Sequence, residues 1–73
     1  MLNKKLFLFV MREYGDTRES LAKALRITPF SLGEKIDQRN EASLSASQRR
    51  RIKARYQLSD LEALALFFGA DIS

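Results

Sequence analysis

Apolar residues recur at helical spacing in successive short runs along the chain, and turn-forming residues separate the runs. The first run predicts a helix over residues 3–14 that ends at Gly15 and has an apolar or aromatic side chain at every fourth position: Leu2, Leu6, Val10 and Tyr14. The apolar stretch 6–11 is equally compatible with a strand, but a lone strand would have no partner in this sequence. We therefore predict a helix, and we expect the last helix to cover its additional apolar side chains, Phe7 and Met11.

Residues 17–36 predict two short helices joined by a tight turn. Thr17 is a typical N-cap for the first helix, and Thr28 followed by Pro29 is a typical start for the second. Apolar residues recur at helical spacing in both, with Ile27 between them: Leu21, Ala22 and Leu25 in the first helix, and Leu32 and Ile36 in the second. This layout is that of a helix-turn-helix, a motif that places its second helix in the major groove of DNA.

The rest of the chain predicts a polar loop followed by two more helices. Residues 37–44 are polar and turn-forming, with Leu44 as an apolar anchor. Two capping boxes then open helices over about residues 45–56 and 59–69, and these boxes are Ser45 with Gln48 and Ser59 with Glu62. The apolar side chains of these helices are Ile52 and Tyr56 in the fourth, and Leu61, Leu64, Phe67 and Phe68 in the fifth.

The whole pattern predicts an all-α protein, a compact bundle of about five short helices in a single domain over residues 1–73. A chain of 73 residues buries only about 60% of its unfolded surface, which leaves room for one core and little space for a deep catalytic cleft. The residues expected in that core are Leu21, Ala22, Leu25, Ile27, Leu32, Ile36, Leu44, Ile52, Leu58 and Leu64.

The sequence resembles the small helix-turn-helix regulators of phages and prophages of Gram-positive bacteria, the Cro-like and repressor-like group. The resemblance covers roughly residues 6–68 and is carried by the stretches ESLAKAL-R-ITPFSL-EKI, EASLSASQ and YQLSDLEALALFF. Two residues depart from the family pattern. Arg26 stands in the turn where the family usually has glycine, so it would have to adopt a left-handed conformation. Arg49 stands where the fourth helix usually offers an apolar residue, so this helix either packs less deeply or buries the Arg49 stem with its charge outward.

The resemblance implies sequence-specific binding of double-stranded DNA by a transcription regulator that occupies an operator and blocks polymerase. One helix that reads a few base pairs binds weakly, so we expect a homodimer on two half-sites, about 34 Å apart if they lie one turn apart. The candidate dimer surface is the apolar excess on the fifth helix, especially Phe67 and Phe68. The alternative is that these side chains close the core of the monomer over the first helix.

Composition limits the other classes of function. The chain has no cysteine and no histidine, which removes disulfide frameworks, thiol nucleophiles and the common zinc ligand sets. No histidine exists to activate a serine, and neither the acids nor the glycines form a catalytic or phosphate-binding pattern, so we expect no enzyme, cofactor, metal or small-molecule ligand. The apolar run 6–11 is too short for a signal peptide or a membrane span, so we expect a cytoplasmic protein of the bacterial host with no membrane association.

The positive charge of the chain is concentrated in one segment. The net charge is +4, yet residues 42–59 hold five basic residues and no acid, and the other positions hold eight basic and nine acidic residues, a net of 8 − 9 = −1. Such a local field favours a polyanionic partner. The alternative is a solvated helix face that only aids solubility.

On a wheel of 100° per residue, the face of the third predicted helix opposite Leu32 and Ile36 holds Phe30, Glu34 and Asp37. The face has no Arg, Asn or Gln, the side chains that most often contact guanine and adenine. Phe30 could contact a thymine methyl group, and Glu34 could accept a hydrogen bond from a cytosine amino group. The alternatives are that Phe30 packs over the second helix and that the two acids are only solvated.

Other residues near this helix complete the predicted DNA contacts. Thr28 and Ser31 could bond to a base edge or a phosphate, Gly33 would permit close approach, and Lys35 could reach a phosphate. Arg18 opens the second helix, where the resemblance implies a backbone or base contact. Positive or polar contacts after the third helix and on the fourth are expected from Arg39, Asn40, Arg49 and Arg50.

A second hypothesis places a different function on the same fold. Acids repel phosphate and an exposed aromatic side chain can anchor a protein interface, so the face with Phe30, Glu34 and Asp37 also suits an antirepressor or modulator that binds another phage regulator. A membrane-surface protein is a weaker third option, because the basic and apolar features lie on different helices.

Overall fold

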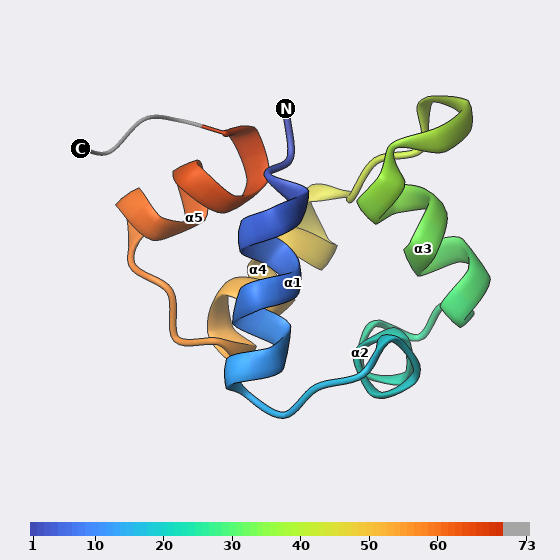
Figure 1. Cartoon of the computed structure of the whole chain (residues 1–73), viewed down its shortest axis with the longest axis horizontal. Helices are drawn as coiled ribbons and strands as arrows, with labels where there is room; N and C mark the ends of the chain where they lie inside the picture. Colours follow the sequence, from blue (N-terminus) through green and yellow to red (C-terminus); the bar gives the residue numbers. More distant parts are fainter. Residues whose placement is uncertain (70–73) are drawn as a thin grey trace.

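A computed structural model describes residues 1–69 of the chain and shows α-helices and no strand in that range (Figure 1). The predicted all-α bundle is therefore confirmed. Its Cα radius of gyration of 11.3 Å matches the value of about 11 Å expected for a compact domain of this length. The elements are α1 (Lys4–Glu13), α2 (Arg18–Leu25), α3 (Pro29–Asp37), a 3₁₀ turn (Arg39–Glu41), α4 (Ala46–Arg55) and α5 (Asp60–Phe68).

Local side-chain caps start every α-helix in residues 1–69. The hydroxyls of Ser45 and Ser59 each accept the backbone N–H three residues on, and Gln48 and Glu62 complete the two predicted capping boxes. Three more helices begin at an N-cap of the same kind: Asn3, Thr17 and Thr28. These contacts span only three residues, which is why the sequence predicts the helix starts well.

The turn between α2 and α3 contains the expected left-handed residue. Arg26 has φ 59° and ψ 39°. The backbone N–H of Ile27 donates to the carbonyl oxygen of Ala22 at 3.0 Å, which closes the end of α2 as glycine-ended helices usually do. The chain therefore makes this turn without glycine.

The core agrees with most of the predicted residues, and α1 contributes more to it than expected. Buried as predicted are Leu21, Ala22, Leu25, Leu32, Ile36, Leu44 and Ile52, while Ile27 and Leu58 are half-buried at its edge. Phe7 and Met11 are the buried residues of α1, which packs against both α3 and α5 in the middle of the bundle (Figure 1). The four-residue repeat that predicts this helix thus lies beside its buried face rather than on it.

The prediction for α5 is wrong at Leu64, whose side chain is 45% exposed. The buried residues of this helix are Ala65, Leu66 and Phe67. Apolar side chains occur all around α5, so the sequence pattern does not indicate which face turns inward. Phe67 is buried in the core of the monomer, as the alternative for this pair predicts, whereas Phe68 is 52% exposed and its place in a dimer surface stays a prediction.

The segment before α1 runs along the end of α5 (Figure 1). The backbone N–H of Asn3 donates to the carbonyl oxygen of Leu66 at 2.9 Å. Gly69 ends α5 with φ 66°, and a Cβ atom there would lie 2.6 Å from the carbonyl oxygen of Met1. Glycine is therefore required at this crossing by both the backbone angle and the space.

Within residues 1–69, every helix falls short of the length and apolar character that a membrane crossing needs.

Candidate nucleic-acid interface

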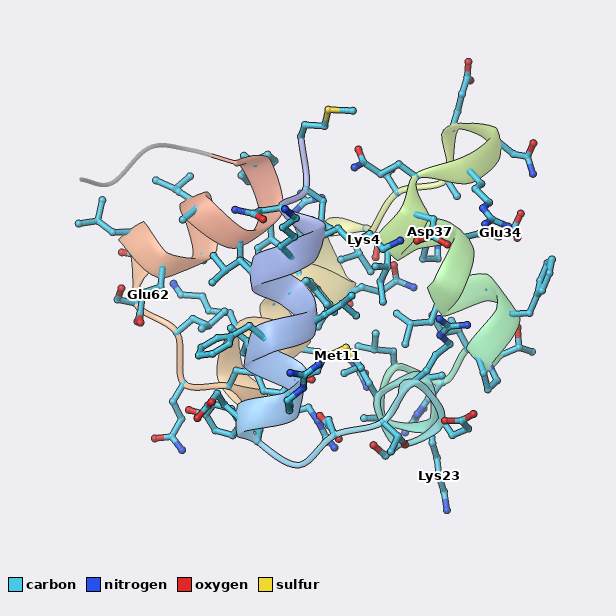
Figure 2. All side chains as sticks on the ribbon, viewed as in Figure 1. Lys4, Met11, Lys23, Glu34, Asp37 and Glu62 are labelled. Atoms are coloured by element: carbon cyan, nitrogen blue, oxygen red, sulfur yellow. The ribbon has the colours of Figure 1, made fainter. Side chains whose placement is uncertain are left out.

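Packing against α2 and α1 determines which side of α3 faces outward. Leu32 and Ile36 are buried at 0% and 3% exposure, and Ala22 is fully buried where α2 and α3 pack together. In Figure 2 Glu34 points away from the bundle, whereas Asp37 and Lys4 of α1 point toward one another. Glu34 is therefore on the outward face that the helical wheel predicts, whereas Asp37 is turned toward α1 and its side chain is 23% exposed.

The first turn of α3 presents an aromatic side chain to solvent. Phe30 is 75% exposed, so the alternative that it packs over α2 is wrong. Beside it, Thr28 accepts the backbone N–H of Ser31 at 3.0 Å, and the Thr28 hydroxyl keeps its own proton for a further partner. An exposed aromatic ring and a hydroxyl thus stand together at the start of the helix.

Arg18 lies directly on α3 at Gly33. A Cβ atom at Gly33 would lie 3.4, 3.6 and 3.8 Å from Nη1, Cζ and Nε of the Arg18 guanidinium. Gly33 is buried, with the Arg18 guanidinium at van der Waals distance from its Cβ position, so the Arg18 cation lies at the edge of the outward face. The close approach to DNA that Gly33 would permit stays a prediction.

Arg12 adds a second cation near Arg18. A shallow groove between the end of α1 and the start of α2 is lined by both arginines, together with Leu8, Asp16 and Ile36. Sequence reasoning missed Arg12 because it precedes the motif, and only the packing of α1 against the motif helices brings it there.

The two acids that the helical wheel places opposite Leu32 and Ile36 have partners within the chain. Asp37 forms ion pairs with Lys4 at 2.6 Å and with Arg39 at 3.6 Å. The hydrogen bond from Lys4, and then the charges of Lys4, Arg39 and Arg18, lower the pKa of Asp37. The positive charges of these side chains offset the negative charge of Asp37.

Glu34 accepts a hydrogen bond from Nδ2 of Asn40 at 3.1 Å. The Asn40 amide is thus engaged with α3 rather than free to meet a base, whereas the Arg39 side chain remains 72% exposed. Of these two residues after α3, Arg39 is the better placed for an external partner.

Lys35 and Arg49, both expected at phosphates, are turned toward the loop that follows α3. Nζ of Lys35 donates to the carbonyl oxygen of Ser43 at 3.0 Å, and Nη1 of Arg49 donates to that of Leu44 at 2.7 Å. The Arg49 guanidinium also lies over the ring of Phe68, 5.3 Å from its centroid. The expectation that Arg49 sends its charge outward is therefore wrong, because the charged end is held against backbone and an aromatic ring.

The other cations of α4 differ in how far they are engaged. Arg50 is exposed and has no hydrogen bond or ion pair within residues 1–69. Arg51 reaches the carbonyl oxygen of Ala24 at 3.5 Å, and Lys53 and Arg55 form ion pairs with Asp60 and Asp16. Much of the positive charge that the sequence concentrates in this segment therefore has a partner inside the molecule.

Asp16 anchors the start of α2 to the end of α4. Its side chain is 6% exposed and accepts hydrogen bonds from Ser20, Arg55 and Tyr56 at 2.6 to 2.7 Å. The bonds from Arg55 hold the pKa of Asp16 well below its usual range, while burial raises the pKa of Tyr56. Because Arg18 follows two residues later, this network positions the cation that lies on α3.

Comparison of the chain with protein-family models, with curated proteins and with solved structures finds no match. Within residues 1–69, no three acidic, histidine or cysteine side chains gather in a group able to hold a metal ion. Any functional argument therefore depends on the residues of this surface.

Proposed function

We propose that the protein binds double-stranded DNA through α3 and acts as a phage or prophage transcription regulator by occupying an operator. The observation that supports this proposal is the outward face of α3, which presents the exposed Phe30 and carries the Arg18 guanidinium at its edge, over Gly33. An aromatic ring can contact a thymine methyl group in the major groove, and a guanidinium at the groove edge can hold a phosphate. The α2–turn–α3 unit then serves as the helix-turn-helix.

The paired acids make this face more compatible with phosphate than the sequence alone indicates. Asp37 is compensated by Lys4 and Arg39, and the Glu34 carboxylate carries a hydrogen bond from Asn40. Additional phosphate contacts are proposed for Arg39, which keeps most of its side chain exposed, and for Arg50.

Salt dependence of binding tests this proposal. Log K for DNA from the protein's own promoter region should fall with log salt at a slope of about −0.9 per neutralised phosphate. Arg18→Ala should weaken binding and make that slope shallower by about one unit, and Arg39→Ala should do the same. Lys23, which extends from α2 away from α3 (Figure 2), supplies the matched control, since Lys23→Ala should leave the slope unchanged. Equal effects of Arg18→Ala and Lys23→Ala would contradict the assignment.

The 75% exposure of Phe30 also favours a second candidate, a protein-binding antirepressor or modulator on the same fold. Under DNA binding, Phe30→Ala should weaken operator binding more than binding to random DNA, because a methyl contact carries sequence information. Glu34→Gln should tighten non-specific binding and change base preference at one position by about 1–3 kcal/mol. Under protein binding, both variants should instead loosen the complex with another phage regulator. Parallel titrations against operator, random DNA and that regulator separate the two functions.

A further inference from the structure

A cleft is lined by residues from the segment before α1, the end of α3 and the loop after it, α4 and the end of α5. Its volume is about 260 Å³, equivalent to roughly eight or nine water molecules. The apolar part of its lining comes from Leu2, Leu44, Phe67 and Phe68, and the charged part from Lys35 and Arg49. The cleft is thus apolar on one side and cationic on the other.

Two side-chain cations line this cleft without a counter-charge. Lys35 and Arg49 donate to the carbonyl oxygens of two consecutive residues, Ser43 and Leu44. No carboxylate of residues 1–69 lines the cleft, and within that range neither side chain forms an ion pair. Half-buried charges are normally paired, so this lining favours an anion in the cleft.

The cations also retain donors for such an anion. An ammonium group has three N–H donors and a guanidinium has five, and each group uses one on a carbonyl oxygen. A carboxylate could accept from both, in hydrogen bonds that are stronger than neutral ones because both partners are charged. The chain attached to that carboxylate would lie on Leu44 and Phe67, which are 5% and 7% exposed and form the apolar floor.

We propose that this cleft binds a carboxylate with a small apolar body, held by Lys35 and Arg49 at the charged end and by Leu44 and Phe67 at the apolar end. The site is separate from the outward face of α3 and does not depend on DNA binding. Hexanoate, with eight non-hydrogen atoms, is a probe of about the right size, and its affinity should lie in the low millimolar range.

The test is an NMR titration of the full chain labelled with ¹⁵N. Hexanoate should shift the amide signals of Lys35, Ser43 and Leu44 saturably. Hexanol and hexylamine lack the carboxylate, and inorganic phosphate lacks the apolar body, so each should bind at least about tenfold more weakly. The proposal is overturned if any of the three binds as tightly as hexanoate, or if the shifts lie on another surface.

Variants test whether the two cations bind the carboxylate. Lys35→Met and Arg49→Met should each weaken hexanoate binding about tenfold or more, because each removes a charged hydrogen bond. Arg50→Met is the matched control, since it makes the same change one residue along α4 at an exposed side chain. Thermal unfolding checks that each variant is folded. If Arg49→Met is unfolded, the affinity of Lys35→Met alone decides the test. Equal affinities for Arg50→Met and Lys35→Met would overturn the proposal.

A final variant separates two sources of the carboxylate. Asp71 lies outside the residues that the structure describes and could itself supply the group. If Asp71→Asn binds hexanoate more tightly than the unchanged chain, the chain's own carboxylate competes for the site. If the affinities are equal, the site is open to a free ligand.

Discussion

At the scale of single residues, Arg26 holds a backbone conformation that favours glycine. A φ of 59° costs a residue other than glycine roughly 1–2 kcal/mol. Replacement by glycine removes this cost, and the larger conformational entropy that glycine loses on folding offsets part of the gain. Arg26→Gly should therefore raise the free energy of unfolding by about 1 kcal/mol in urea denaturation. Lys23→Gly, made inside α2, should lower it by about 1 kcal/mol. A loss of stability in both variants would show that the Arg26 side chain contributes more than the backbone strain.

Asp16 is the residue whose charge matters most to acid stability in this structure. Its pKa is lowered on folding by Arg55, so its contribution is present above the unfolded pKa near 4 and is lost as pH falls below it. Asp16→Asn should reduce stability at pH 7 by about 2–3 kcal/mol, and should flatten the fall in stability between about pH 5 and pH 2. Melting curves across that range measure both effects. Asp60→Asn is the control, because the Asp60 side chain is 89% exposed and water screens its ion pair with Lys53, so it should change both far less.

At the scale of the elements, Gly33 of α3 lies against the Arg18 guanidinium of α2, and alanine at this position should change stability without changing binding. Alanine favours a helix interior over glycine by about 1 kcal/mol, and a Cβ atom at Gly33 would make ordinary van der Waals contacts with the Arg18 guanidinium. Gly33→Ala should therefore raise the melting temperature and leave operator binding unchanged, because Arg18 can keep its place on α3. Melting curves and gel shifts on the same preparation check the two outcomes. Weaker operator binding would show that α3 needs glycine here to approach DNA.

At the scale of the whole molecule, α5 leaves an apolar face uncovered. Leu61, Leu64 and Phe68 are 63%, 45% and 52% exposed, and their spacing of three and four places them on one side of the helix. Under the proposed function, we expect this face to join two copies of the chain on two operator half-sites. Leu64→Glu should shift the protein to monomer in sedimentation velocity and abolish cooperative operator binding, with little loss of helix content because Leu64 is outside the core. A monomeric unchanged protein at micromolar concentration would rule out this interface.

The sequence by itself determined the helical class and where most helices begin and end, because those signals act within three or four residues. Ser45 with Gln48 and Ser59 with Glu62 form contacts with near neighbours, so the order of residues is enough to predict them. The left-handed conformation of Arg26 is expected only from the resemblance to a family that usually has glycine there.

The tertiary structure decided which side chains are free for partners, because that depends on residues distant in sequence. Asp16 meets Arg55 across 39 positions, and Tyr14 donates to the carbonyl oxygen of Tyr56 across 42. The orientation of α5 also depends on residues distant in sequence. Apolar side chains occur all around this helix, so only its packing against α1 turns Leu66 inward and leaves Leu64 exposed.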